Sequence, residues 1–285
     1  MSFWDHLEEL RGVIVHSALI LLAVFTVGFF FKDFLFDGVV LKPARPDFWL
    51  YRLLGVDLNL ELINIDIAAQ FFTHIKVTFL VAVVICFPVI CFELWKFIAP
   101  GLYDNERSVI KKAFGLGAGL FYLGIAVGYF IVMPVLLFFF NGYQVSGTIE
   151  NTFALTSYIS IFMAMVFVMG LLFEFPSVLA VLSHVGLINR DDMKGWRRYA
   201  IIVILILSAI LTPTGDPFTM LVVALPLYLL YEFSIFICKP KADDDDDEED
   251  DEEDEEEKKE EKRGRLEEDV DGVKVETARE ENDID

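Results

Sequence analysis

The feature that most constrains this chain is a series of long apolar runs separated by polar or Pro/Gly-bearing breaks. A helix that crosses a bilayer needs about 20 apolar residues to span about 30 Å of hydrocarbon. Because an α-helix satisfies its own backbone hydrogen bonds, such runs predict membrane-spanning helices. The candidate runs lie at about residues 12–31, 70–98, 113–140, 153–183, 199–213 and 218–237. The predicted fold class is an all-α integral membrane protein with six transmembrane helices.

The distribution of charge separates this membrane domain from an acidic tail. The whole chain has a formal net charge of -21, yet residues 1–242 hold 16 basic and 18 acidic side chains. Residues 243–285 hold 26 acidic and 7 basic side chains and few aromatic or β-branched ones. This composition favours a solvated, disordered segment. We therefore expect a six-helix domain over 1–242 and a disordered, solubilising tail over 243–285.

The positions of Lys and Arg predict the orientation of the helices. The loops after the second and fourth runs are basic, with residues such as Arg107 and Arg197, whereas the loops near 141–152 and 213–218 contain neither Lys nor Arg. Basic loops stay in the cytoplasm, and six is an even number, so both termini are predicted to be cytoplasmic. The segment 32–69 opposes this orientation with four basic residues, but the other loops outnumber it.

The fifth run is unusually short. The 15 residues from Tyr199 to Pro213 give a helix of roughly 22 Å, which is less than the hydrocarbon thickness. Gly215 and Pro217 then turn the chain directly into the sixth run. We predict a short hairpin that thins the bilayer locally or sits off its centre.

Glu174 is the acidic residue placed deepest in an apolar run. A charged side chain at that depth costs a few kcal/mol, which makes it a functional candidate. A protonated Glu that bonds a neighbouring helix and only supports packing fits the sequence equally well. Lys76 and Glu93 lie near the ends of the second run, where snorkelling towards water is the simpler explanation.

A second set of acids faces the cytoplasm in this topology. Asp5, Glu8 and Glu9 precede the first helix, while Asp104 and Glu106 follow the second. Two such carboxylate positions could hold guanidinium groups of a partner, because Arg pairs bidentately with carboxylate and Lys does not. The simpler interpretation is an acidic helix N-terminus and a solvated loop.

Several short sequence motifs occur one after another along the chain. They are HLEELR at 6–11, FIAPGLYDNER at 97–107, FEFP at 173–176, LTP at 211–213 and ALPLY at 224–228. With these motifs the chain resembles the TatC family, the signal-peptide receptors of the twin-arginine protein translocase. The resemblance covers about residues 5–238, which is nearly the whole membrane domain.

The resemblance implies a function at the cytoplasmic face of a prokaryotic plasma membrane. Family members bind the twin-arginine signal peptides of folded precursor proteins, in an export complex driven by the proton-motive force. The family's binding carboxylates match Glu9 and Glu106. The residues expected to shape the same patch are Arg11, Phe97, Pro100 and Arg107.

The resemblance also assigns roles away from that patch. It places Glu174 inside a concave, glove-like bundle and matches Pro43 to a proline of the first outer loop. TatA-type partners, and TatB where it exists, are expected to dock near Thr212, and other TatC copies are expected in the complex. Asp216 lies one position later than the family's usual Asp, which leaves its role in partner docking open.

Two other classes of protein compete with this interpretation. A proton-coupled secondary transporter could use Glu174, but it would need internal repeats and broken polar helices that the runs lack. An aspartyl protease would need paired aspartates, whereas Asp104 and Asp216 are predicted on opposite sides of the bilayer, about 30 Å apart. We therefore predict a non-enzyme and keep the transporter as the alternative function.

The cysteines indicate neither a disulfide framework nor a metal centre. Cys86, Cys91 and Cys238 lie in apolar runs, with no CxxC pair and no His at ligand spacing. Such cysteines are typical of core or lipid-facing positions. No metal, cofactor or nucleic-acid partner is predicted.

Overall fold

The computed structural model describes residues 3–56, 58, 60–98, 104–149, 151–212, 215–238 and 240. At 3–6, 98 and 104–110 it describes the backbone alone. The chain divides into two units, Met1–Lys239 and Pro240–Asp285, close to the predicted boundary at 242. The predicted disorder of the tail lies outside the described residues.

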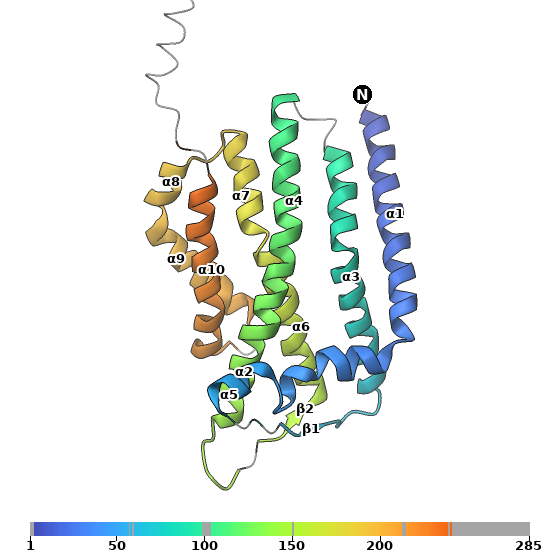
Figure 1. Cartoon of the computed structure of the whole chain (residues 1–285), viewed down its shortest axis with the longest axis vertical. Helices are drawn as coiled ribbons and strands as arrows, with labels where there is room; N and C mark the ends of the chain where they lie inside the picture. Colours follow the sequence, from blue (N-terminus) through green and yellow to red (C-terminus); the bar gives the residue numbers. More distant parts are fainter. Residues whose placement is uncertain are drawn as a thin grey trace, which may run out of the picture. The chain divides into compact units, whose positions relative to one another are not determined.

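The first unit is a set of helices that lie side by side (Figure 1). The α-helices are α1 (Phe3–Phe29), α2 (Trp49–Leu54), α3 (Ala69–Ile98), α4 (Asp104–Val127), α5 (Met133–Gly142), α6 (Leu155–Leu172), α7 (Phe175–His184), α8 (Arg190–Gly195), α9 (Arg197–Leu211) and α10 (Pro217–Ile237). The other elements are the π-helices η1 (Phe34–Val40) and η4 (Gly128–Val132), the 3-10 helix η2 (Lys42–Ala44), and the strands β1 (Leu62–Ile63) and β2 (Phe153–Ala154). The two strands pair in parallel, with Leu62 opposite Phe153.

Five helical stretches in the described ranges are long and apolar enough to cross a membrane. They are Leu7–Phe29, Ala69–Phe97, Lys111–Gly142, Leu155–His184 and Pro217–Ile237, and they match five of the six predicted runs. The remaining run forms α9, which is a helix of 15 residues and therefore about 22 Å long. Its shortness agrees with the sequence, while its passage through the bilayer stays a prediction.

Two of these stretches are interrupted for identifiable reasons. The π-helix η4 separates α4 from α5 just before Pro134. The backbone nitrogen of proline carries no hydrogen and cannot donate a helical hydrogen bond. Pro176 at the start of α7 has the same effect on the fourth stretch, which breaks between Leu172 and Phe175. Glu174 therefore lies at a break between two helices rather than inside a continuous one.

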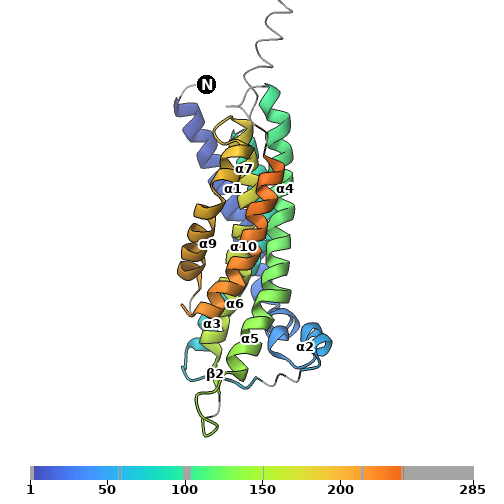
Figure 2. The same ribbon diagram turned by 90° about the vertical axis from the view of Figure 1, so that its left-hand side faces the viewer.

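Several helix termini lie at one end of the bundle. α1 begins there, α3 ends, α4 begins and α10 ends (Figure 1), and Figure 2 shows the beginnings of α1 and α4 at the same end. We call this the N-terminal end. The opposite end carries η1, η2, α2 and the strand pair, and we call it the cap end. The start of α1 and the end of α10 thus share one end. The six crossings and the cytoplasmic location of this end remain predictions.

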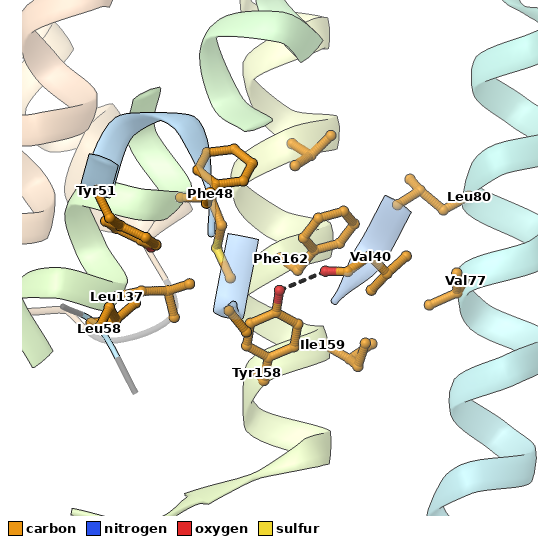
Figure 3. Packing of buried hydrophobic residues seen from close by; sticks show 13 residues of the cluster. Val40, Phe48, Tyr51, Leu58, Val77, Leu80, Leu137, Tyr158, Ile159 and Phe162 are labelled. Carbon is orange, nitrogen blue, oxygen red and sulfur yellow. Dashed lines mark hydrogen bonds between the residues drawn. The ribbon is translucent and has the colours of Figure 1, made fainter. Parts of the chain in front are cut away.

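Hydrogen bonds from tyrosine hydroxyls connect the elements of the cap end. Tyr158 donates to the carbonyl of Val40 at 2.6 Å, a bond drawn in Figure 3 among the buried residues of this cluster. Tyr51 donates to the carbonyl of Pro43 at 2.8 Å, and both residues are buried. Burial raises the pKa of Tyr51 above its ordinary value, so this hydroxyl keeps its proton as a donor. Pro43 therefore has a packing role in this protomer.

Candidate functional site

A groove of about 560 Å³ lies between α1 and α3 towards the N-terminal end. It combines charged and apolar side chains. Its lining residues are Glu9, Gly12, Val13, His16, Leu19, Ile20, Glu93, Lys96 and Phe97. The α1 residues recur at helical spacing, so one face of that helix forms one wall of the groove.

Glu9 is the predicted binding residue that the structure places most clearly. It lies on α1, and its Oε2 atom is buried without a hydrogen-bond partner among the described residues. A carboxylate oxygen removed from water without a donor is costly. A cationic ligand in the groove would supply the missing donor.

The other residues predicted for this patch are only partly described. Phe97 lines the same groove, and Arg11 is exposed on α1. Pro100 lies outside the described residues, as do the side chains of Glu106 and Arg107. The backbone of the latter two belongs to the first turn of α4.

The start of α4 is nevertheless informative. The backbone of Asp104 and Glu106 lies in its first turn. This turn lies at the same end of the bundle as the beginning of α1 (Figures 1 and 2). The two predicted carboxylate positions are therefore on one side of the helix bundle, as the hypothesis of a shared ligand requires.

Glu174 occupies a second, half-buried site between α4 and the break that precedes α7. A Cβ built on Gly117 of α4 would overlap Glu174 Oε2 and would lie 2.9 Å from Ser177 Oγ. Glu174 Oε1 is buried, and no hydrogen-bond partner for it is found in the described part of the chain. Ser177 donates to the Ala113 carbonyl at 2.8 Å across the same contact. A side chain at 117 would therefore have to displace the carboxyl group from its present position.

The predicted partner-docking residues lie where α9 turns into α10. Thr212 directly follows α9 and is 4% exposed. Asp216 is the N-cap of α10, and it accepts a hydrogen bond from the backbone N–H of Thr219 at 2.8 Å and another from the Thr219 hydroxyl. Pro217 at the first helical position completes a common helix start. The shifted Asp216 thus has a capping role within this chain.

Comparisons with known proteins agree with this geometry. The family model described as Sec-independent protein translocase protein (TatC) matches residues 5–226. The chain belongs to the TatC family. It is accordingly a subunit of a Sec-independent protein translocase, a component of a transport complex with membrane-spanning helices.

Individual relatives show how far the likeness extends. The TatC protein of Blattabacterium sp. subsp. Periplaneta americana (strain BPLAN) is 36% identical, covering 83% of this chain and 94% of that protein. The TatC protein of Halothiobacillus neapolitanus is 35% identical over 84% of this chain and 62% of its own length. The crystal structure of the twin arginine translocase receptor TatC in DDM superposes with a TM-score of 0.67 at 32% identity, covering 82% of this chain and 99% of that one.

Sequence reasoning missed two features of this TatC-family chain. Glu93 was expected to snorkel, but its side chain is 16% exposed and lines the groove beside Glu9. Gly117 was not singled out, although it makes the space that Glu174 fills. Both features depend on which helices are neighbours in the fold, and a local sequence pattern does not predict helix neighbours.

Proposed function

We propose that this chain is the receptor subunit that binds twin-arginine signal peptides of folded precursors at the cytoplasmic face of a prokaryotic plasma membrane. In this role it nucleates an export complex driven by the proton-motive force. The observation that carries the proposal is the buried, unpartnered Oε2 of Glu9 in the groove among the described residues. Family membership and the shared end of α1 and α4 support it.

The chemistry of the groove explains why the ligand would need arginine. A guanidinium group offers five donors in a planar fork that matches a carboxylate, whereas an ammonium group is a compact point charge. Two carboxylate positions, Glu9 and Glu106, would each take one arginine of the pair. Replacing either arginine with lysine would lose the fork geometry at that position.

The proposal is tested by placing a photo-crosslinking residue at position 9 or 106 of the full-length protein in membranes. We expect both positions to crosslink to a twin-arginine peptide but not to its twin-lysine version. In parallel, Glu9→Ala and Glu106→Ala should abolish export of a twin-arginine reporter while the protein stays inserted. Equal crosslinking to both peptides, or normal export by both variants, would contradict the proposal.

Glu174 is proposed to act after the peptide has docked. Its carboxyl group lies against Gly117 and does not line the groove of Glu9. We expect Glu174→Ala to leave peptide docking unchanged and to impair later transport, since a buried carboxyl group at a helix break is suited to a change of packing or protonation. Crosslinking before and after energisation separates the two steps, and a docking defect in Glu174→Ala would reject this role.

Partner helices of the TatA type, and TatB where present, are proposed to dock along α9. The helix leaves a row of large apolar side chains exposed, including Ile202 at 56%, Ile206 at 56% and Ile210 at 74%. Thr212 directly follows this row, but its own side chain is buried, so the exposed face of α9 rather than the Thr212 side chain would make the contact. Cysteine crosslinking from Ile210 to a single-helix partner should succeed, whereas crosslinking from the buried Thr219 should fail. The reverse pattern would move the docking surface elsewhere.

A further inference from the structure

The groove of Glu9 contains a second carboxylate. Glu93 lies on α3 and lines the groove from the wall opposite α1. Its side chain is 16% exposed, although it lies within two turns of the helix end, where a Glu could reach water. The side chain is therefore turned into the groove rather than away from it.

Glu93 already has a weak internal counter-ion. Lys96 Nζ lies 3.1 Å from Glu93 Oε1, three residues further along α3. The Lys96 side chain is 54% exposed and also lies over the ring of Phe92, at 4.7 Å from its centroid. An ion pair between residues three positions apart on one helix, with its cation exposed to solvent, contributes little to stability. A better cation would displace Lys96 at little cost.

We propose that Glu93 is a further binding residue for the arginine-bearing segment of the signal peptide, and that Lys96 is an internal cation which the ligand's guanidinium replaces. This inference rests on the proposed receptor function. Glu9 and Glu93 face one groove from two helices, and the fork of a single guanidinium has donors for both carboxylates. Lys96 keeps Glu93 neutralised until the ligand arrives.

The rest of the groove fits the segment that follows the arginines. The lining of α1 continues from Glu9 through Val13 and His16 to Leu19 and Ile20, so the wall is charged at one end and apolar at the other. At 1.5 Å per residue this wall is about 16 Å long. Export signals place a cationic region before an apolar stretch of about 7–15 residues. The groove therefore matches the ligand in charge and in the order of its parts.

The test compares two substitutions that should act in opposite directions. Full-length protein in lipid nanodiscs is titrated with a twin-arginine peptide, for the wild type and for Glu93→Gln and Lys96→Gln. We expect Glu93→Gln to weaken binding about three- to tenfold, because one carboxylate contact is lost. Lys96→Gln should tighten binding about threefold and steepen its salt dependence, because the competing cation is gone.

A matched control separates contact from overall charge. Lys112→Gln removes the same charge from an exposed position on α4 that does not line the groove, and it should change binding little. Tightening equal to that of Lys96→Gln would show a long-range field and overturn the inference. The inference would also be overturned if Glu93→Gln and Lys96→Gln both weakened binding, or if both left it unchanged. A purely structural ion pair on α3 would give one of these results. Since Lys96 is exposed, its variant tests the inference even if Glu93→Gln fails to fold.

The outcome for the receptor function is read separately. If the wild type binds the peptide and Glu9→Gln weakens binding, but neither Glu93→Gln nor Lys96→Gln shifts it, only this inference fails. If the wild type itself does not distinguish the twin-arginine peptide from its twin-lysine version, the proposed function fails.

Discussion

The contact between α1 and α3 and the contact between α4 and α6 are built in different ways. Along α1 and α3, three buried polar atoms have no hydrogen-bond partner in the described ranges, namely Glu9 Oε2, His74 Nε2 and Thr78 Oγ1. The most apolar part of α1 is only 6% buried. Because α1 packs chiefly against one helix, α3, most of its surface and the groove beside Glu9 remain open.

The contact between α4 and α6 is closed by glycine. A Cβ on Gly124 of α4 would come within 2.7 Å of the Phe173 side chain and would overlap the Met169 carbonyl. In the Leu155–His184 stretch, half of the residues in the most apolar 18-residue segment are buried. Helices in lipid gain their association from such close backbone approach at small residues.

The difference indicates that one helix contact stabilises the bundle and the other is suited to binding. The α4–α6 contact supplies rigidity, since it has no room for a methyl group at Gly124. The α1–α3 contact keeps polar groups unsatisfied beside an open groove, a condition that costs stability and favours binding. Substitutions in the two contacts and at the cap end should therefore have different effects on binding and stability.

The largest effect is expected at Glu9. Glu9→Gln should lower the affinity for a twin-arginine peptide by about 2–5 kcal/mol, the usual cost of losing one partner of a desolvated charge pair. Its melting temperature should not fall, because the substitution removes an unpartnered charge. Peptide titration and thermal unfolding of the same sample measure both quantities. A parallel loss of stability would show that Glu9 supports packing instead.

The next effect is expected at the glycine contact. Gly124→Ala should lower the free energy of unfolding by about 1–3 kcal/mol, because the added methyl overlaps backbone and an aromatic ring. Gly12→Ala is the matched control in the open contact, where no atom lies within 4 Å of the added Cβ. The control should be neutral or slightly stabilising, since Ala favours helix over Gly. Equal destabilisation of the two variants would remove the distinction between the contacts.

A smaller effect is expected at the cap end. Tyr158→Phe removes the donor to the buried Val40 carbonyl and should cost about 1–2 kcal/mol of stability. Peptide affinity should be unchanged, because the bond lies at the opposite end from the groove. Unfolding in denaturant, followed by helix content, measures the loss. A drop in affinity at unchanged stability would contradict this assignment.

The smallest effect is expected at Thr78. Thr78→Val keeps the shape and removes a hydroxyl that has no partner among the described residues, so stability should change by less than about 0.5 kcal/mol or rise. The contrast with Tyr158→Phe is the informative quantity, since both variants delete one buried hydroxyl. A loss at Thr78 as large as that at Tyr158 would mean that the α1–α3 contact is as well satisfied as the cap.

The helices were largely predictable from the sequence, because their formation in lipid depends on local composition. Five predicted runs match the apolar helical stretches, and the short fifth run became α9 with 15 residues. The same reasoning did not place the break at Glu174, although Pro176 was a visible signal for it. The capping role of Asp216 was also readable from the Asp-Pro pair, but the resemblance drew attention to docking instead.

What the sequence alone determined is the all-helical membrane fold, its order of runs and its family, since apolar length and motif order are properties of neighbouring residues. The tertiary structure decided which helices touch. It brought Glu93 of α3 beside Glu9 of α1, 84 positions apart, and set Gly117 of α4 against Glu174. These pairings depend on the volumes and contours of whole helix faces, which the hydrophobicity of a single run does not encode.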